Sequence, residues 1–142
     1  MVSIITFKNM GTESIRKPIY LGVIIVTIVI ALHAAASYFG WYWIFRWFDI
    51  PMHILGGVFA GYLGMVIYMF RTGRKNPSLW IPLLTALIVG IAWEFLENAY
   101  GVSGLNAVYR FDTIKDIIDD MMGGVISLAL WDFFIYKKQP QK

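Results

Sequence analysis

The sequence contains no cysteine and few charged residues, and both shortages narrow the class of protein. Without cysteine the chain has no disulfide framework and no thiolate metal site. Charged residues make up 15% of the chain and apolar residues 58%, against about 25% and about 45–50% in ordinary soluble domains. There is no nucleic-acid-binding motif and no basic stripe, so we expect no nucleic-acid partner. The low charged fraction and the high apolar fraction together predict a membrane protein.

Four apolar windows are each long enough for a transmembrane helix, which needs about 20 mainly apolar residues. They cover approximately residues 19–39, 51–70, 78–99 and 113–136. None of them alternates with the period of two that a strand would show. We therefore predict an all-α polytopic protein, a four-transmembrane-helix bundle in which residues 1–142 form a single integral membrane domain in the lipid bilayer. Asn76 and Pro77 are expected to be the N-cap and first residue of the third helix.

The basic residues predict the direction of the chain in the membrane. Nine of the twelve lie before the first window, between the second and third, or after the fourth. An even number of spans places these three segments on the same side, which the positive-inside rule makes cytoplasmic. We therefore expect both termini in the cytoplasm and the protein in the cell membrane. The three basic residues expected on the outer side are Arg46, Arg110 and Lys115.

The acidic residues show the opposite distribution. Seven of the nine lie at the predicted outer ends of the second, third and fourth windows, and His53 lies with them. The seven are Asp49, Glu94, Glu97, Asp112, Asp116, Asp119 and Asp120. Acids that face lipid are costly, by roughly 2.5–3.5 kcal/mol for an aspartate at mid-span. We therefore expect these side chains to face the interior of the bundle or a wet cavity.

The spacing of these polar residues lets them meet on shared helix faces. Residues three or four apart lie on one face, as Asp49 and His53 do, and Glu94 and Glu97. Crowded carboxylates cannot all ionise unless protons, bound cations or basic side chains neutralise them. Three outer bases are too few for seven acids, so a divalent metal ion is the expected cofactor, of a kind the ligands do not define. The predicted metal ligands are Asp49, His53, Glu94, Glu97, Asp116 and Asp120.

Simpler structural roles compete with this interpretation. Asp112 precedes Thr113 and could cap the fourth helix, and Asp116 would then lie in its first turn. His33 more often makes an interhelical hydrogen bond than binds a metal. The aromatic segment "GWYWIFRWFDI" is either an interfacial belt or an in-plane segment that covers a site or holds a lipid tail. Capping does not explain Asp119 and Asp120, which lie further along the helix.

Three short motifs resemble those of the VanZ-like and YjdF-like families of small membrane proteins. They are "DIPMHILGG", "WEFLEN" and "DTIKDIIDDMMGG". The matching positions are Asp49, His53, Gly57, Trp93, Glu94, Glu97, Asp112, Asp116 and Gly123. Asp120 departs from the pattern, because VanZ-like sequences tend to have asparagine there. The resemblance covers the second to fourth windows and implies a shared polar site, in families linked to glycopeptide-antibiotic tolerance, more than it implies a particular activity.

Three functions are compatible with this pattern. In an intramembrane metal-dependent enzyme, the metal would polarise a polar or phosphorylated lipid head group or activate water. Arg110 would hold an anionic group, and Asp119 would act as general base. Alternatively, the chain is a non-catalytic subunit of a larger membrane complex or a homo-oligomer. The third hypothesis is ion or proton transport, although the inner halves of the windows carry few polar groups.

Overall fold

The structure is a computed structural model that describes residues 12–100 and 107–136, with side chains described for residues 15–100 and 111–136. Every regular element in this part of the chain is helical, as predicted. The long helices are α2 (Thr12–Tyr38), α4 (Asp49–Thr72), α5 (Trp80–Ala99) and α6 (Ala107–Trp131). The short elements are α3 (Trp41–Ile44), a 3₁₀ turn η1 (Arg46–Phe48) and a π-helical turn η2 (Asp132–Tyr136).

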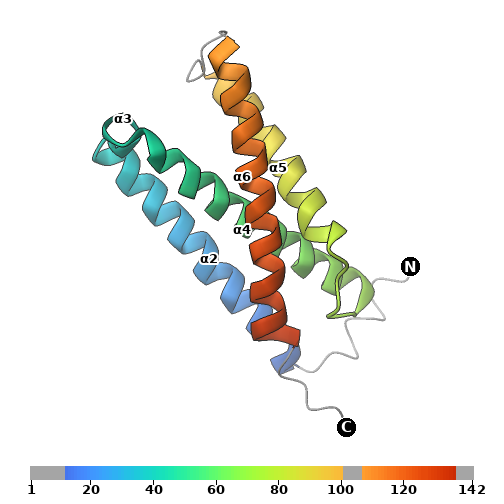
Figure 1. Cartoon of the computed structure of the whole chain (residues 1–142). Coiled ribbons are helices and arrows are strands. Elements are labelled where there is room, and N and C mark those ends of the chain that lie inside the picture. Colours follow the sequence, from blue (N-terminus) through green and yellow to red (C-terminus); the bar gives the residue numbers. More distant parts are fainter. Residues whose placement is uncertain (1–11, 101–106, 137–142) are drawn as a thin grey trace.

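Helix α4 is the centre of the arrangement. It packs most extensively against α6, then against α5, and also contacts α2. Figure 1 shows α6 crossing α4, with α5 beside α6, and α2 and α4 meeting near the short helix α3. Helices α2 and α5 therefore end, and helices α4 and α6 begin, toward the same end of the molecule. We call it the polar end, because His53, Glu94 and Asp116 lie there.

Three helical segments are long and apolar enough to cross a membrane. They are Ile15–Tyr38, Arg46–Thr72 and Trp80–Ala99. These segments agree with the first three predicted windows to within a few residues, apart from earlier starts at Ile15 and Arg46. Helix α6 has 25 residues, but its acidic residues and Lys115 make its first half too polar to qualify by composition.

Two predicted helix starts are wrong. Helix α5 begins at Trp80, so Asn76 does not cap it and Pro77 is not its first residue. Instead, Ser78 accepts a hydrogen bond from the Trp80 N–H at 3.3 Å, a local contact that competes with an earlier helix start. Helix α6 begins at Ala107, several residues before the fourth apolar window, so Asp112 is not its N-cap and Asp116 is not in its first turn. Capping therefore explains neither aspartate.

Glycines bring α4 and α6 into backbone contact. A methyl group added at Gly57 would overlap the backbone carbonyl group of Asp120, and one added at Gly123 would overlap the carbonyl oxygen of Ile54. One helical turn further along α4, a methyl group at Gly61 would overlap the Ser127 hydroxyl. This close packing of small residues, which is common between membrane helices, positions the side chains of the two helices that lie just beyond the crossing.

The opposite end of the molecule is packed with apolar and aromatic side chains. Tyr62 and Trp131 are fully buried with ring centroids 5.4 Å apart. The Tyr62 hydroxyl donates to the Pro18 carbonyl at 2.9 Å, and the Trp131 indole donates to the Lys75 carbonyl at 2.9 Å. Each buried aromatic thus has a partner for its polar atom, as buried tyrosine and tryptophan usually do. These contacts hold α2, α4 and α6 together at this end.

The glycine contact predicts a sharp difference between two adjacent residues. Gly57→Ala should lower the free energy of unfolding by about 1–3 kcal/mol, the usual cost of overpacking a tight contact. Gly56→Ala is the matched control, because its methyl group would meet only Asp120 Oδ1, at an ordinary 3.7 Å. Thermal unfolding of both variants in detergent, followed by circular dichroism, measures the difference. Equal unfolding midpoints would show that the helices do not cross as closely as described.

Candidate metal centre at the polar end

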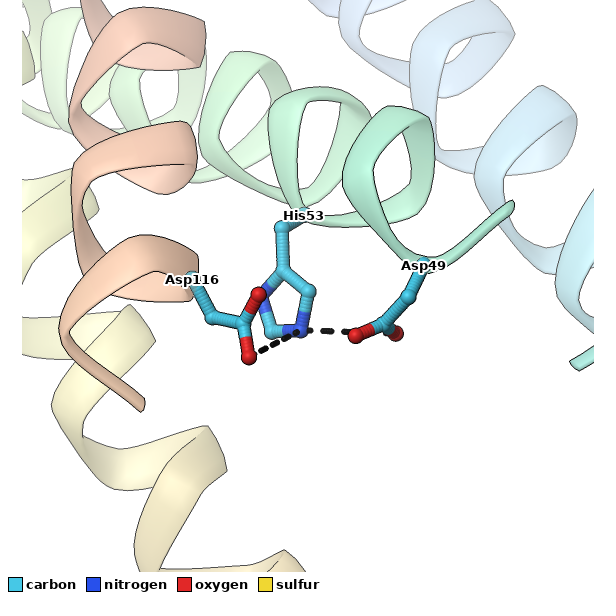
Figure 2. Close-up of side chains that lie close together, drawn as sticks. All are labelled: Asp49, His53 and Asp116. Atoms are coloured by element: carbon cyan, nitrogen blue, oxygen red, sulfur yellow. Dashed lines mark ion pairs between the residues drawn. The ribbon is translucent and has the colours of Figure 1, made fainter. Parts of the chain in front are cut away.

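His53 lies at the centre of a group of carboxylates contributed by two helices. It is one turn into α4, and its side chain is only 5% exposed. Its Nε2 atom lies 3.6 Å from Asp49 Oδ1 and 3.9 Å from Asp116 Oδ2. Figure 2 shows the imidazole between these two carboxylates, with both contacts made by the same ring nitrogen. We call Asp49, His53 and Asp116 the metal cluster, since one ligand atom from each lies within 4.8 Å of the others.

The other ring nitrogen of His53 faces a third carboxylate. Nδ1 lies 3.5 Å from Asp120 Oδ2, on the opposite side of the ring from Asp49 and Asp116. Space for the Asp120 carboxylate comes from Gly90 of α5, where a methyl group would overlap it. The sequence predicts Asp120 as a metal ligand, whereas the geometry favours a role in orienting the imidazole. Such carboxylate–histidine contacts fix which nitrogen is free to bind a metal.

Two further buried carboxylates have an oxygen without a hydrogen-bond partner. Glu94 of α5 is 6% exposed, and Asp119 of α6 is 8% exposed. By distance, Glu94 Oε1 and Asp119 Oδ2 have no hydrogen-bond partner among the described side chains, although the Thr113 hydroxyl lies near enough to Glu94 to act on its carboxylate as a donor. Leaving a buried charged group unpaired costs several kcal/mol, more than the roughly 1–3 kcal/mol typical of a neutral group. Both carboxylates interact electrostatically with Asp116, His53 and Asp120, so they belong to the same polar region.

Among the described side chains, Lys115 is the one Lys or Arg that forms ion pairs in this region. Its ammonium contacts Asp116 Oδ1 closely and lies 3.4 Å from Asp112 Oδ1. Asp112 itself is exposed, and its carboxylate pairs with Lys115. Arg46 is exposed and makes no such ion pair, and the side chain of Arg110 lies outside the described residues. The predicted role of Arg110 as an anion-binding residue therefore stays a prediction.

Glu97 is not a member of the metal cluster, although it interacts electrostatically with Glu94, His53 and Asp49. Its Oε1 atom accepts a hydrogen bond from the Trp93 indole at 2.8 Å, one turn earlier on α5. The ring of His33 of α2 contacts the Trp93 ring, with the two ring centroids 6.1 Å apart. His33 also shares a 2.8 Å hydrogen bond with the Tyr42 hydroxyl of α3. The structural role predicted for His33, an interhelical hydrogen bond, is thus confirmed.

Tyr42 is a member of the polar end that the sequence does not distinguish from its aromatic neighbours. Burial, followed by the negative charges of Asp49 and Glu97, raises the pKa of the Tyr42 hydroxyl to about 12. Its phenol therefore stays protonated and can donate a hydrogen bond at any physiological pH. Six aromatic residues lie between Trp41 and Phe48, so composition alone cannot show which of them turns toward the acids.

The unpaired Glu94 oxygen leads to a prediction about stability. In protein treated with a chelator, Glu94→Gln should raise the free energy of unfolding by about 1–3 kcal/mol, because it removes a buried carboxylate that Asp116 and Asp120 repel. Asp112→Asn is the matched control: its carboxylate is exposed, so the change should stay within about 0.5 kcal/mol. Thermal unfolding in the same detergent measures both. A loss of stability in Glu94→Gln would mean that this carboxylate already has a stabilising partner.

Comparison with known proteins agrees with a membrane location. A family model described as "Predicted membrane protein (DUF2238)" matches residues 4–138, which include every residue of the polar end. No curated protein and no solved structure matches the chain significantly. The family match confirms the expected class of small membrane protein and carries no information about a ligand or a reaction.

Proposed function

Since this chain belongs to the DUF2238 family of predicted membrane proteins, we propose that it is a four-span membrane protein that binds a divalent metal ion at Asp49, His53 and Asp116. The ion would serve to bind a phosphorylated or otherwise polar lipid head group. The resemblance of the same three motifs to VanZ-like and YjdF-like proteins is part of this proposal. Metal binding would explain why these polar residues lie together, which helix capping does not.

One observation carries the metal proposal: both ring nitrogens of His53 face carboxylates. A neutral imidazole has a single N–H, so it can satisfy the carboxylate on only one side. If Nδ1–H donates to Asp120, the lone pair of Nε2 points at Asp49 and Asp116, and a cation between them removes the repulsion. Ligand atoms around one ion, each about 2.0–2.6 Å from it, lie roughly 3–4.5 Å apart. The atoms of the metal cluster are already close to this spacing.

The competing explanation is a doubly protonated His53 that serves as the counter-ion. It would satisfy Asp49, Asp116 and Asp120 with two N–H groups and no metal. It leaves Glu94 Oε1 and Asp119 Oδ2 buried and unpaired, however. A divalent ion provides more positive charge than one imidazolium to this acidic region, in which Glu94 and Asp119 both interact electrostatically with His53 and Asp116. The charge balance therefore favours the metal.

The metal would supply Lewis-acid chemistry, and the chain would supply the remaining groups. Asp119 lies on the same helix as Asp116, and its free buried oxygen makes it the candidate to accept a proton from a bound water or head group. Lys115 holds one oxygen of Asp116, which leaves the other turned toward His53. This arrangement suits binding and polarising a ligand at the outer ends of the helices.

Transport has weaker support than ligand binding. Among the described residues, the buried ionisable side chains lie at one end, and the other end holds a packed core that includes Tyr62, Met65, Met69 and Trp131. An ion path needs polar groups through the whole thickness of the membrane. The subunit hypothesis is compatible with the same cluster, and it predicts that other chains rather than a metal ion neutralise the acids.

Metal binding can be measured directly on the purified full chain. Elemental analysis and isothermal titration with Mn²⁺ and Zn²⁺ should give about one ion per chain. Asp49→Asn, His53→Ala and Asp116→Asn should each abolish binding, and Asp120→Asn should weaken it about 10–100-fold, as loss of an orienting partner does. Asp112→Asn is the control that should bind normally. A metal-free wild type with a doubly protonated His53, seen by nitrogen-15 NMR, would refute the proposal.

The proposed four-span topology also has a clear test, because the chain has no cysteine of its own. Single substitutions Trp43→Cys, Arg74→Cys and Lys142→Cys place one thiol in the α3 segment, the α4–α5 turn and the C-terminus. With four spans, a membrane-impermeant maleimide added to intact cells should label the first variant and not the other two. Labelling of Lys142→Cys from outside would mean that α6 does not cross the membrane.

A further inference from the structure

A second polar group lies beside the metal cluster, where the ends of α2, α3 and α5 meet. We call it the aromatic–acid corner, and it consists of His33, Tyr42, Trp93 and Glu97. The four side chains form a connected set: Tyr42 hydrogen-bonds to His33, the His33 and Trp93 rings meet edge to face at 88°, and Trp93 donates to Glu97. Side chains from three helices thus bring three rings and one carboxylate together.

The corner carries negative charge without a basic partner among the described side chains. Glu97 accepts one hydrogen bond from Trp93 and pairs with no Lys or Arg. The Tyr42 hydroxyl is partly buried and lies within electrostatic range of both Asp49 and Glu97. Glu94, one turn from Glu97, adds a buried oxygen that has no hydrogen-bond partner. Aromatic faces combined with uncompensated carboxylates attract organic cations, by cation–π contact and by charge-assisted hydrogen bonds.

Asp49 joins the corner to the metal cluster. Its carboxylate lies 3.6 Å from His53 Nε2, and its charge also acts on Tyr42. At 35% exposure it is the most accessible member of the metal cluster. A ligand with an anionic group on the metal and a cationic group a short distance away would therefore engage both groups of side chains at once.

The elements around the corner indicate the layer from which such a ligand comes. The α3–η1 segment exposes large apolar side chains, with Trp43 85% and Trp47 62% exposed. Exposed tryptophans beside apolar helices are typical of the head-group layer of a membrane. Because Tyr42 belongs to this same segment, the corner lies at the depth of lipid head groups.

We propose that the aromatic–acid corner binds the primary ammonium group of an ethanolamine-type phospholipid, whose phosphate lies at the metal cluster. This inference rests on the proposed metal function and names the head group that it would accept. A primary ammonium suits the corner better than a quaternary one, because its N–H groups can donate to Glu97 and Asp49. A head group without an amine, such as glycerol phosphate, leaves these carboxylates unpaired.

The test compares two short-chain lipids that differ in the head-group amine. The full chain in detergent, loaded with Mn²⁺, is titrated with dihexanoyl phosphatidylethanolamine and with dihexanoyl phosphatidylglycerol. The ethanolamine lipid should bind about tenfold more tightly, the equivalent of one charge-assisted contact. Glu97→Gln should reduce this preference to less than about threefold while leaving the affinity for phosphatidylglycerol and the bound Mn²⁺ unchanged. Asp132→Asn, in the η2 turn that follows α6, is the matched acid control and should keep the preference.

The outcomes separate this inference from the proposed function. If the chain binds Mn²⁺ but has equal affinity for the two lipids, the amine site is wrong and the metal site is unaffected. A lipid preference that survives Glu97→Gln has the same meaning. A chain that binds no Mn²⁺ overturns the metal proposal itself. Phosphoethanolamine and glycerol 3-phosphate, titrated in parallel, should show the same preference at lower affinity. Soluble phosphoethanolamine binding as tightly as the lipid would assign the corner to a free amine phosphate instead.

Discussion

The close crossing of α4 and α6 positions His53 against Asp116 and Asp120. Gly57 of α4 and Gly123 of α6 each face the backbone of the partner helix with no room for a methyl group. Because the backbones touch there, the residues next to the crossing have no freedom to separate, and His53 is held among Asp116 and Asp120. A wider crossing would allow these side chains to diverge toward lipid. Small residues in a membrane helix usually serve packing alone, whereas here the same contact fixes an electrostatic arrangement.

That arrangement is unfavourable unless something positive completes it. Lys115 neutralises one oxygen of Asp116, and a neutral His53 can donate to only one of the carboxylates around it. The buried oxygens of Glu94 and Asp119 have no partner. The tightly packed aromatic core at the opposite end supplies stability that can offset this cost. Functional sites commonly retain such locally unfavourable arrangements, which the rest of the fold stabilises.

The sequence predicts the helices and the gathering of the acids well, since both follow from strong signals, long apolar windows and spacing on helix faces. It predicts helix starts poorly: Asp112 has the residue type and context of a cap, yet α6 already begins at Ala107. It also cannot show which nitrogen of His53 faces which carboxylate, because that depends on the crossing angle of α4 and α6. The separation of Glu97 from the metal cluster has the same origin. Glu94 and Glu97 lie three residues apart on α5, but only the tertiary contacts reveal that Trp93 and His33 hold Glu97 in a different group.

The depth of the two groups limits what they can bind. The metal cluster and the aromatic–acid corner share the end of the molecule at which α3 exposes its tryptophans, and the core beyond them is apolar. Under the proposed function, a ligand from water would have to pass an interfacial aromatic segment, whereas a lipid head group would already lie in that layer and would reach the site by lateral diffusion. Such a ligand would not need to cross the membrane, so the lack of buried ionisable side chains in the described part of the packed core is no obstacle. The same geometry that disfavours a transport path therefore favours a site for a membrane lipid.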